Sequence, residues 1–316
     1  MGDVCSIAST SNTPIVVSIA LVNWNNRDYL RQCLDSIEAA QLSCRYEIVV
    51  ADNGSTDGSL EMLDRFFSWV RVVQNGSNVG VARGNNECIR NSSGQFILIL
   101  NNDTIVNRAS IESMVAFLQA HPQAGAAGGD LLNPDGSLQA GYCRFPTLWE
   151  EILLVTHAGR RLNPIFPSRR AAWLEAHEVD WLSSASILVR REAIEQIGLI
   201  DESYFIYSDE TDWQYRLWQA GWKVYHLPGV TTVHFGGGSF PLGSKRYTLV
   251  YRGRMLFARK FYSRLYSVVQ RVLFASAAVA RLAVWRAVRL CPRWRSVARR
   301  QVESNCETLR LCFRLS

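Results

Sequence analysis

The feature of this sequence that most constrains its fold is the stretch from Ile97 to Asp103. Its first four residues, Ile97 to Leu100, are all apolar, which predicts a strand buried on both faces, as in a parallel sheet. The apolar run stops at Asn101, Asn102 and Asp103. Polar groups at the carboxyl ends of such strands point into the crevice where open α/β sheets bind ligands. A carboxylate beside amide oxygens suits a hard divalent cation; the alternative is an Asx turn that caps the next helix.

The rest of the first half repeats this order of strand, polar turn and helix. Apolar runs predict strands at 15–22, 46–51 and 70–74, and helical spacing predicts helices at 27–40, 60–67 and 87–91. Polar residues follow the first strand at Asn23–Asn26 and the second at Asp52–Gly58. This alternation predicts an α/β fold with a mostly parallel sheet flanked by helices. The first turn has no glycine, so it is neither a P-loop nor a dinucleotide-binding fingerprint.

The second half shows the same elements less regularly. Helices are expected at 111–120, 192–197 and 213–220, and strands at 124–129, 186–190, 221–225 and 230–234. The segment 141–178 is rich in Arg, Pro and Trp, and its pattern predicts no regular structure.

Three carboxylates, Asp209, Glu210 and Asp212, lie at the start of the helix expected at 213–220. The helix dipole favours negative charge at that end, which is a structural explanation for one or two of them. Three carboxylates within four residues repel one another unless they share a cation or a proton. The cluster therefore favours a functional site over a simple helix start.

The charge of the chain is distributed unevenly. Residues 1–244 contain 17 Lys and Arg against 26 Asp and Glu, whereas residues 245–316 contain 17 against 2. A strongly basic tail on an acidic body indicates that the tail faces an anionic surface.

The tail is predicted to be helical. On one helix, four of its arginines project within about 60° of one direction: Arg264, Arg271, Arg286 and Arg289. A basic helix with apolar residues elsewhere is typical of binding at a membrane surface. Nucleic-acid binding is a second interpretation, but no helix-turn-helix, zinc-finger or RNP motif is present; a packed helical cap is a third. The longest uncharged apolar run, 272–280, is too short for a membrane-spanning helix, and Pro292 is expected to interrupt the helices.

The amino-terminal residues and the cysteines bear on the compartment. Residues 1–13 are polar and have no apolar core of a signal peptide, so we expect a disordered leader and a cytoplasmic protein. The eight cysteines form no C-x-x-C pair, which predicts free thiols in a reducing cytosol.

Six motifs, in order over roughly residues 14–260, resemble GT-A glycosyltransferases of family 2, in particular the rhamnosyltransferase-like members. The motifs are Val22–Asn25, Asp52–Asp57, Asn78–Asn86, Leu100–Asp103, Tyr207–Trp213 and Val233–His234. The resemblance implies a GT-A domain, a Rossmann-like sheet between helices, which we expect over 14–244. The basic amphipathic helical tail predicted from the charge pattern follows over 245–316.

The resemblance also implies a nucleotide pocket. Trp24 stands where such enzymes hold an aromatic ring against the base, and Asp52 stands where a carboxylate accepts the hydrogen of the pyrimidine N3. Asn78 and Arg83 belong to the segment that lines the pocket, and Asn102 is assigned to nucleotide binding with them.

The resemblance further implies a metal site and a base. Asn101 and Asp103 occupy the ends of the metal-binding D-x-D element, with Asn in place of the first Asp, and His234 corresponds to an additional ligand. The metal would be Mg²⁺ or Mn²⁺. Glu210 occupies the position of the catalytic base, where Asp is commoner, and Asp209 and Asp212 flank it.

The predicted function is inverting, metal-dependent sugar transfer in bacterial cell-surface polysaccharide synthesis. The donor is a nucleoside-diphosphate sugar, with dTDP-rhamnose the leading candidate. The acceptor is a glycan or a polyprenyl-diphosphate-linked glycan, reached by a peripheral protein at the inner face of the membrane. One alternative is a sugar-phosphate nucleotidyltransferase, which would require a glycine-rich loop bearing Arg or Lys where this chain has Asn23–Asp28. The other is an inactive GT-A scaffold in an assembly complex.

Overall fold

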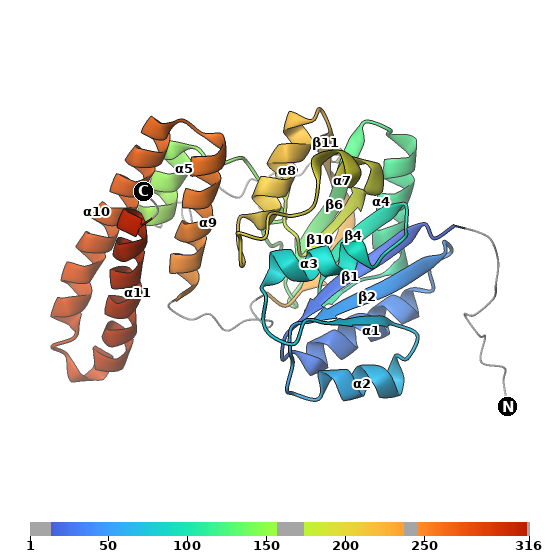
Figure 1. The fold of residues 1–316 in the computed structure, drawn as a ribbon, viewed down its shortest axis with the longest axis horizontal. Helices are drawn as coiled ribbons and strands as arrows, with labels where there is room; N and C mark the ends of the chain where they lie inside the picture. The colour runs from blue at the N-terminus through green and yellow to red at the C-terminus, as the bar shows by residue number, and fades with distance from the viewer. Residues whose placement is uncertain (1–13, 157–173, 237–244, 315–316) are drawn as a thin grey trace.

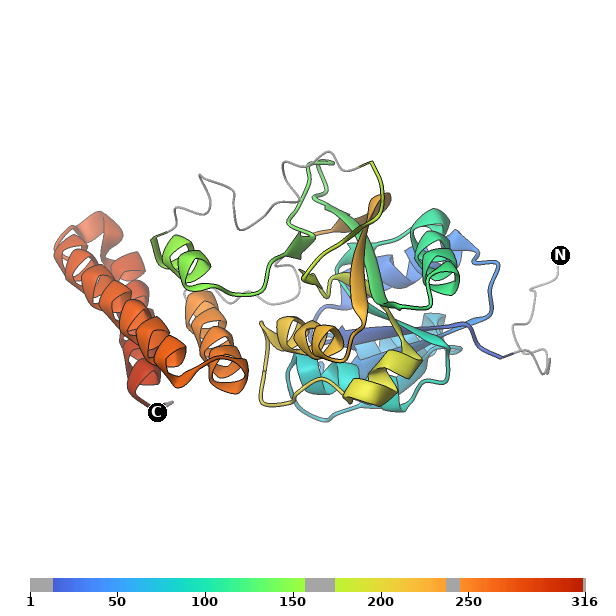
Figure 2. The same cartoon turned by 90° about the horizontal axis from the view of Figure 1, so that it is seen from above.

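The computed structural model describes residues 14–156, 174–236 and 245–314. These residues form an α/β domain with a helical unit beside it (Figures 1 and 2). The expected leader at 1–13 lies outside the described residues.

The α/β domain is built on one mixed sheet. In spatial order its strands are β3 (Arg71–Gln74), β2 (Tyr46–Asp52), β1 (Val17–Asn23), β4 (Phe96–Asn101), β10 (Ser186–Arg190), β6 (Ala124–Leu132), β11 (Lys223–His234) and β5 (Thr104–Ile105), with β8 (His177–Glu178) also on β11. The first four strands are parallel, and β10 runs antiparallel between β4 and β6. A separate two-stranded ribbon joins β7 (Tyr142–Cys143) to β9 (Trp181–Leu182).

Helices cover both faces of this sheet. They are α1 (Arg27–Ala40), α2 (Ser59–Phe66), α3 (Val81–Arg90), α4 (Arg108–Ala120), α7 (Arg191–Ile197) and α8 (Asp209–Gln219). Alternate residues of β1 enter two different cores: Ile19 packs with residues of α1, α2 and α4, whereas Ala20 packs with residues of α3, α7 and α8. Burial on both faces explains why the central strands are continuous apolar runs.

Several element boundaries differ from those expected. α1 and β10 have the predicted bounds, whereas α3 begins at Val81 rather than at 87. Gly84 obscures the helical pattern of α3, and it is glycine for a packing reason: a Cβ there would lie 2.7 Å from Cγ1 of Val22.

The segment 141–178, for which no structure was predicted, contains β7, α5 (Leu148–Thr156) and β8.

The helical unit consists of α5 and the three helices of the tail. These are α9 (Lys245–Phe261), α10 (Arg264–Val288) and α11 (Arg295–Arg314), with a single 3₁₀ turn at Pro292–Trp294 where the interruption was expected. Its core contains Val155, Tyr251, Met255, Phe274 and Cys312. The tail therefore folds as helices around a core of its own.

One expectation about the tail is corrected. Among the described residues, α10 is long and apolar enough to cross a membrane, with a mean hydropathy of 1.5 over its most apolar window and 22% of that window buried. The uncharged run 272–280 alone therefore underestimates the length of this apolar helix. Length and composition are the only grounds, and core helices of soluble proteins meet the same criterion. The seven cysteines of the described residues are free thiols.

Candidate active site

The polar residues that end the parallel strands meet at one edge of the sheet. Asn23 lies opposite Asp52 in the register of β1 and β2, and Val22 lies opposite Asn101 in that of β1 and β4. The Nδ2 of Asn102 donates to Oδ1 of Asn23 at 2.8 Å, and the Nδ2 of Asn23 donates to Oδ1 of Asp52 at 3.1 Å. The edge is thus a connected polar layer, as expected from the strand ends.

The Asn101–Asp103 turn does not cap the next helix. α4 begins at Arg108 and is capped by Asn107, whose side chain accepts from the backbone N–H of Ser110. The alternative interpretation of the turn, as a cap for the next helix, is therefore wrong.

Asp52 organises the loop that follows β2. Its carboxylate is only 1% exposed and accepts from the backbone N–H groups of Gly54 at 3.1 Å and Ser55 at 2.9 Å, in addition to Asn23. The neighbouring Asn53, not Asp52, lines the adjacent cavity. Base recognition by Asp52 stays a prediction, and in this structure its oxygens hold the loop.

A cavity of about 120 Å³ lies above the ends of β1 and β4. Three of the predicted nucleotide-binding residues, Trp24, Asn78 and Asn102, line it, together with Asn101. Arg83 does not: its side chain is exposed on α3 and lies 4.0 Å from Glu202. The further lining residues, which were not assigned a role from the sequence, include Asn53, Gly80, Asn85, Phe205 and Ile206.

The predicted metal ligands come together. β11 pairs with β5 so that His234 is opposite Thr104, which brings the Nε2 of His234 to 3.4 Å from Oδ1 of Asp103 and 3.2 Å from Nδ2 of Asn101. The carboxylate of Asp103 is 1% exposed. A buried carboxylate and an imidazole nitrogen that face the same point are donors that Mg²⁺ or Mn²⁺ can use.

Gln139 fixes the orientation of His234 and was missed by the prediction. Its Oε1 lies 2.9 Å from Nδ1 of His234, and its Nε2 donates to the backbone carbonyl of the same residue at 2.5 Å. An amide oxygen can only accept, so Nδ1 carries the proton and Nε2 presents its lone pair toward Asp103. Nothing in the sequence marks a glutamine 95 positions from its partner.

The carboxylates of α8 lie on the other side of Asn85. This residue lines both the cavity and a small pocket that is also lined by Asp209, Glu210 and Ser184. A hydrogen bond between the carboxyl groups of Asp209 and Glu210 requires a shared proton, and it favours the ionised form of Asp209 and the protonated form of Glu210. Burial raises the pKa of Asp209, and burial together with the charge of Asp209 raises the pKa of Glu210 well above its usual value. A carboxyl group tuned in this way suits proton transfer.

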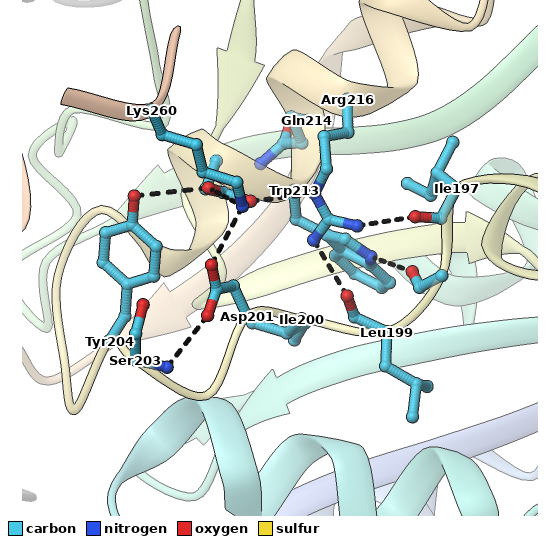
Figure 3. A network of polar contacts seen from close by, with 12 residues as sticks. Ile197, Leu199, Ile200, Asp201, Ser203, Tyr204, Trp213, Gln214, Arg216 and Lys260 are labelled. Atoms are coloured by element: carbon cyan, nitrogen blue, oxygen red, sulfur yellow. Dashed lines mark hydrogen bonds and ion pairs between the residues drawn. The ribbon is translucent and has the colours of Figure 1, made fainter. Parts of the chain in front are cut away.

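Asp212, the third predicted catalytic carboxylate, belongs to a different network, in which Figure 3 labels its partners Tyr204, Arg216 and Lys260. It is fully buried, and its carboxylate accepts hydrogen bonds from Nε of Arg216 at 2.8 Å, Nζ of Lys260 at 2.7 Å and the hydroxyl of Tyr204 at 3.2 Å. Arg216 in turn donates to the backbone carbonyls of Ile197 and Leu199. These contacts favour a structural role for Asp212, which ties the start of α8 to the loop before it.

The turn that leads into α8 is held in an unfavourable backbone conformation. Tyr207 and Ser208 have φ values of 68° and 66°, in the left-handed region, although neither is glycine. Such residues cost on the order of 1 kcal/mol or more each and persist only where surrounding contacts enforce them. They fix the direction in which Asp209 and Glu210 leave the turn.

Comparisons with known proteins agree with this arrangement. The sequence model of Glycosyl transferase family 2 matches residues 18–198. An N-acetylglucosaminyl-diphospho-decaprenol L-rhamnosyltransferase of Mycobacterium tuberculosis is 29% identical over 240 residues, which cover 69% of this chain and 76% of that protein. Rhamnosyltransferase WbbL of Escherichia coli is 22% identical over 70% of this chain and 83% of its own length.

The fold is also similar to that of solved glycosyltransferases. The mannosyltransferase PcManGT from Pyrobaculum calidifontis, solved with GDP-Man and Mn²⁺, is similar with a TM-score of 0.56 at 16% identity, over 96% of this chain and 89% of that chain. The family model covers more than half of the sequence, and the fold agrees with it. The chain therefore belongs to glycosyl transferase family 2 and is a glycosyltransferase with the GT-A fold.

Proposed function

We propose that this enzyme transfers a sugar, with rhamnose favoured, from a nucleoside-diphosphate donor to a glycan or polyprenyl-diphosphate-linked acceptor, with inversion and with a divalent metal. The observation that carries the proposal is the geometry around the cavity. Asp103 and His234 face one point beside Asn101, which lines the cavity, and Asn85 lines both this cavity and the small pocket of Asp209 and Glu210. Membership of family 2 leaves the nucleotidyltransferase alternative without support.

The residues present fit a divalent cation. Asp103 and His234, with Asn101 beside them, would hold it, and Gln139 keeps Nε2 of His234 available. The described residues contain no group of three or more His, Cys, Asp or Glu side chains suited to a metal. Donor phosphates and water would therefore supply the remaining ligands, as is usual for Mg²⁺. A bound cation would neutralise the charge that grows on the leaving diphosphate.

Glu210 is the proposed general base. The acceptor hydroxyl loses its proton as its oxygen attacks the anomeric carbon, and a carboxylate beside it accepts that proton. Burial and the charge of Asp209 raise the pKa of Glu210, so its carboxylate is a stronger base than that of an ordinary glutamate. A single displacement of this kind inverts the anomeric centre. Trp24 and Asn78 in the cavity wall would receive the nucleotide.

The names of the relatives support the donor and acceptor classes. The protein of Mycobacterium tuberculosis is named for L-rhamnosyl transfer to a diphospho-decaprenol acceptor, and that of Escherichia coli is also named a rhamnosyltransferase. The similar fold was solved with GDP-Man, so the fold alone does not select the sugar.

A donor screen tests this function. The protein is incubated with dTDP-rhamnose, UDP-, GDP- and dTDP-linked hexoses, Mg²⁺ or Mn²⁺, and a synthetic N-acetylglucosaminyl-diphospho-polyprenol. We expect dTDP-rhamnose to give transfer, and NMR of the product to show the inverted anomeric configuration. Turnover in EDTA equal to that with metal, or a retained configuration, would contradict the mechanism. Lack of transfer and of donor hydrolysis with every sugar would favour the scaffold alternative.

The helical tail is the proposed contact with an anionic membrane surface, as a peripheral protein at the cytoplasmic face. One side of α10 exposes apolar residues: Leu265, Val268, Val269, Val272 and Val279. Exposed arginines such as Arg286 and Arg289 accompany them. An apolar stripe beside cationic side chains is suited to the boundary between lipid headgroups and acyl chains.

We expect Arg286→Glu with Arg289→Glu, or Val272→Ser with Val279→Ser, to weaken sedimentation with vesicles of phosphatidylglycerol and phosphatidylcholine. Each Lys or Arg near an anionic surface contributes about 1 kcal/mol, so reversing two of them is a large change. Phe66→Ser, at an exposed apolar residue of α2, is the matched control. Substitution is preferable to truncation because α10 buries Phe274 in the core of the helical unit. Unchanged binding by both double variants would refute the proposed surface.

A further inference from the structure

The strained turn before the catalytic carboxylates is covered by a helix of the tail. A Cβ on Gly253, in the middle of α9, would lie 2.5 Å from the backbone oxygen of Tyr207 and 2.9 Å from Oγ of Ser208. Glycine is unfavourable inside a helix, since it lowers helix propensity relative to alanine. Here it allows the backbone of α9 to lie directly against the two left-handed residues.

The same helix reaches the first turn of α8 at its other end. Nζ of Lys260 lies 2.7 Å from Oδ2 of Asp212 and 2.9 Å from Oδ2 of Asp201 (Figure 3). Asp212 is fully buried, so Lys260 and Arg216 together compensate its charge. Lys260 thereby joins α8, the loop at 197–204 and the tail.

Aromatic packing fills the space between these two contacts. The ring of Tyr215 in α8 lies 5.3 Å from that of Phe257 and 4.6 Å from that of Phe261, both in α9. α9 also brings Arg254 near the carboxylates, and its charge lowers the pKa of Glu210 against the effects of burial and of Asp209. The contact between α8 and α9 is therefore tight and includes charges on both sides.

We propose that α9 is part of the catalytic unit, and that Gly253 and Lys260 are positioning residues that hold Glu210 in its working orientation. The inference rests on the proposed role of Glu210 as base. It extends the functional unit beyond residue 244, where the sequence placed the end of the glycosyltransferase domain. It also assigns α9 a different role from α10, whose exposed apolar residues form the proposed membrane contact.

The test compares two charge removals in the last turn of α9. Lys260→Met should lower kcat at least 10-fold, with the Kd for dTDP, measured by calorimetry, within twofold of the parent. Arg259→Met removes the same charge from an exposed neighbour and should change neither. Lys260→Arg should restore most of the activity. The acid limb of the kcat–pH profile should shift in Lys260→Met, because the surroundings of Glu210 have changed.

Gly253→Ala provides a second variant if Lys260→Met folds poorly. Helix propensity alone predicts a more stable protein with normal activity, whereas the close contact predicts a displaced turn and a loss of kcat of at least 10-fold. All rates are taken with dTDP-rhamnose, or with the sugar that the donor screen identifies, and are expressed per folded molecule from circular dichroism.

The outcomes separate this inference from the proposed function. If Glu210→Gln is inactive while Lys260→Met and Gly253→Ala keep parental kcat per folded molecule and an unshifted pH profile, the positioning role is refuted and the base survives. If Glu210→Gln is fully active, the proposed role of Glu210 as base is refuted, and with it the positioning role that depends on it.

Discussion

Glu210→Gln is expected to lower kcat by about 10²–10⁴-fold, the usual contribution of a general base, while donor binding is retained. The amide keeps the shape of the side chain and removes the proton acceptor. Steady-state kinetics give kcat, and calorimetry with dTDP gives the donor affinity independently of turnover.

The pH dependence supplies a second readout of the same residue. The base must be deprotonated to act, and the pKa of Glu210 is raised by burial and by Asp209. The parent enzyme should therefore lose activity as the pH falls through a value above that of an ordinary glutamate, and this limb should be absent from the residual activity of Glu210→Gln.

Neighbouring amide substitutions distinguish the three carboxylates. Asp209→Asn should have an intermediate effect, because it removes the charge that raises the pKa of Glu210. Asp212→Asn should act mainly on stability, since it weakens pairing with Arg216 and Lys260. If Asp209→Asn loses kcat while Glu210→Gln keeps it, the base is Asp209. Activity in all three variants would rule out the mechanism.

Asp103→Ala is expected to abolish turnover, with a loss on the order of 10³-fold or more, because stabilisation of the leaving diphosphate by a metal is worth several kcal/mol. Mn²⁺ binding in the presence of dTDP, followed by electron paramagnetic resonance, should fall in parallel. This readout does not depend on activity.

Substitution of Gln139 should weaken Mn²⁺ binding less severely than substitution of Asp103. Gln139→Leu removes the acceptor at Nδ1 of His234 and should weaken Mn²⁺ binding about 10–100-fold, the usual effect of losing a residue that orients a metal ligand. Asp35→Ala, at an exposed carboxylate of α1, is the control and should leave binding unchanged. Parental activity of Asp103→Ala in EDTA would exclude a metal at this position.

The local parts of the fold were predictable because local pattern determines them. The helix at Arg27–Ala40 buries Leu30, Cys33, Leu34 and Ile37 at helical spacing, and its predicted bounds are those observed. α3 was predicted too short because glycines at its start and at position 84 serve contacts with other elements. β11 was predicted as two strands since Pro228 and Gly229 interrupt its pattern, although tertiary pairing with β6 carries it through.

The residues of the candidate site likewise fall into those that local sequence pattern predicts and those that only tertiary contacts reveal. Residues proposed to act through their own chemistry, such as Asp103, Glu210 and His234, occur in recognisable motifs. Residues that act through a partner are visible only in three dimensions: Gln139 beside His234, and Lys260 beside Asp212. Asp212 is the opposite case: its motif predicts chemistry, its contacts are those of a buried ion pair, and its catalytic role stays a prediction.

The bulge in β11 has a consequence for engineering. The strand leaves the register of β6 at Leu227 and resumes it at Thr231, so that residues 228–230 have no partner positions. Side chains alternate between the faces of a strand, and a change of one residue there would turn His234 away from Asp103. Loop grafts intended to change the acceptor should therefore conserve the length of the chain between α8 and His234, even though the bulge itself looks like a convenient site for insertion.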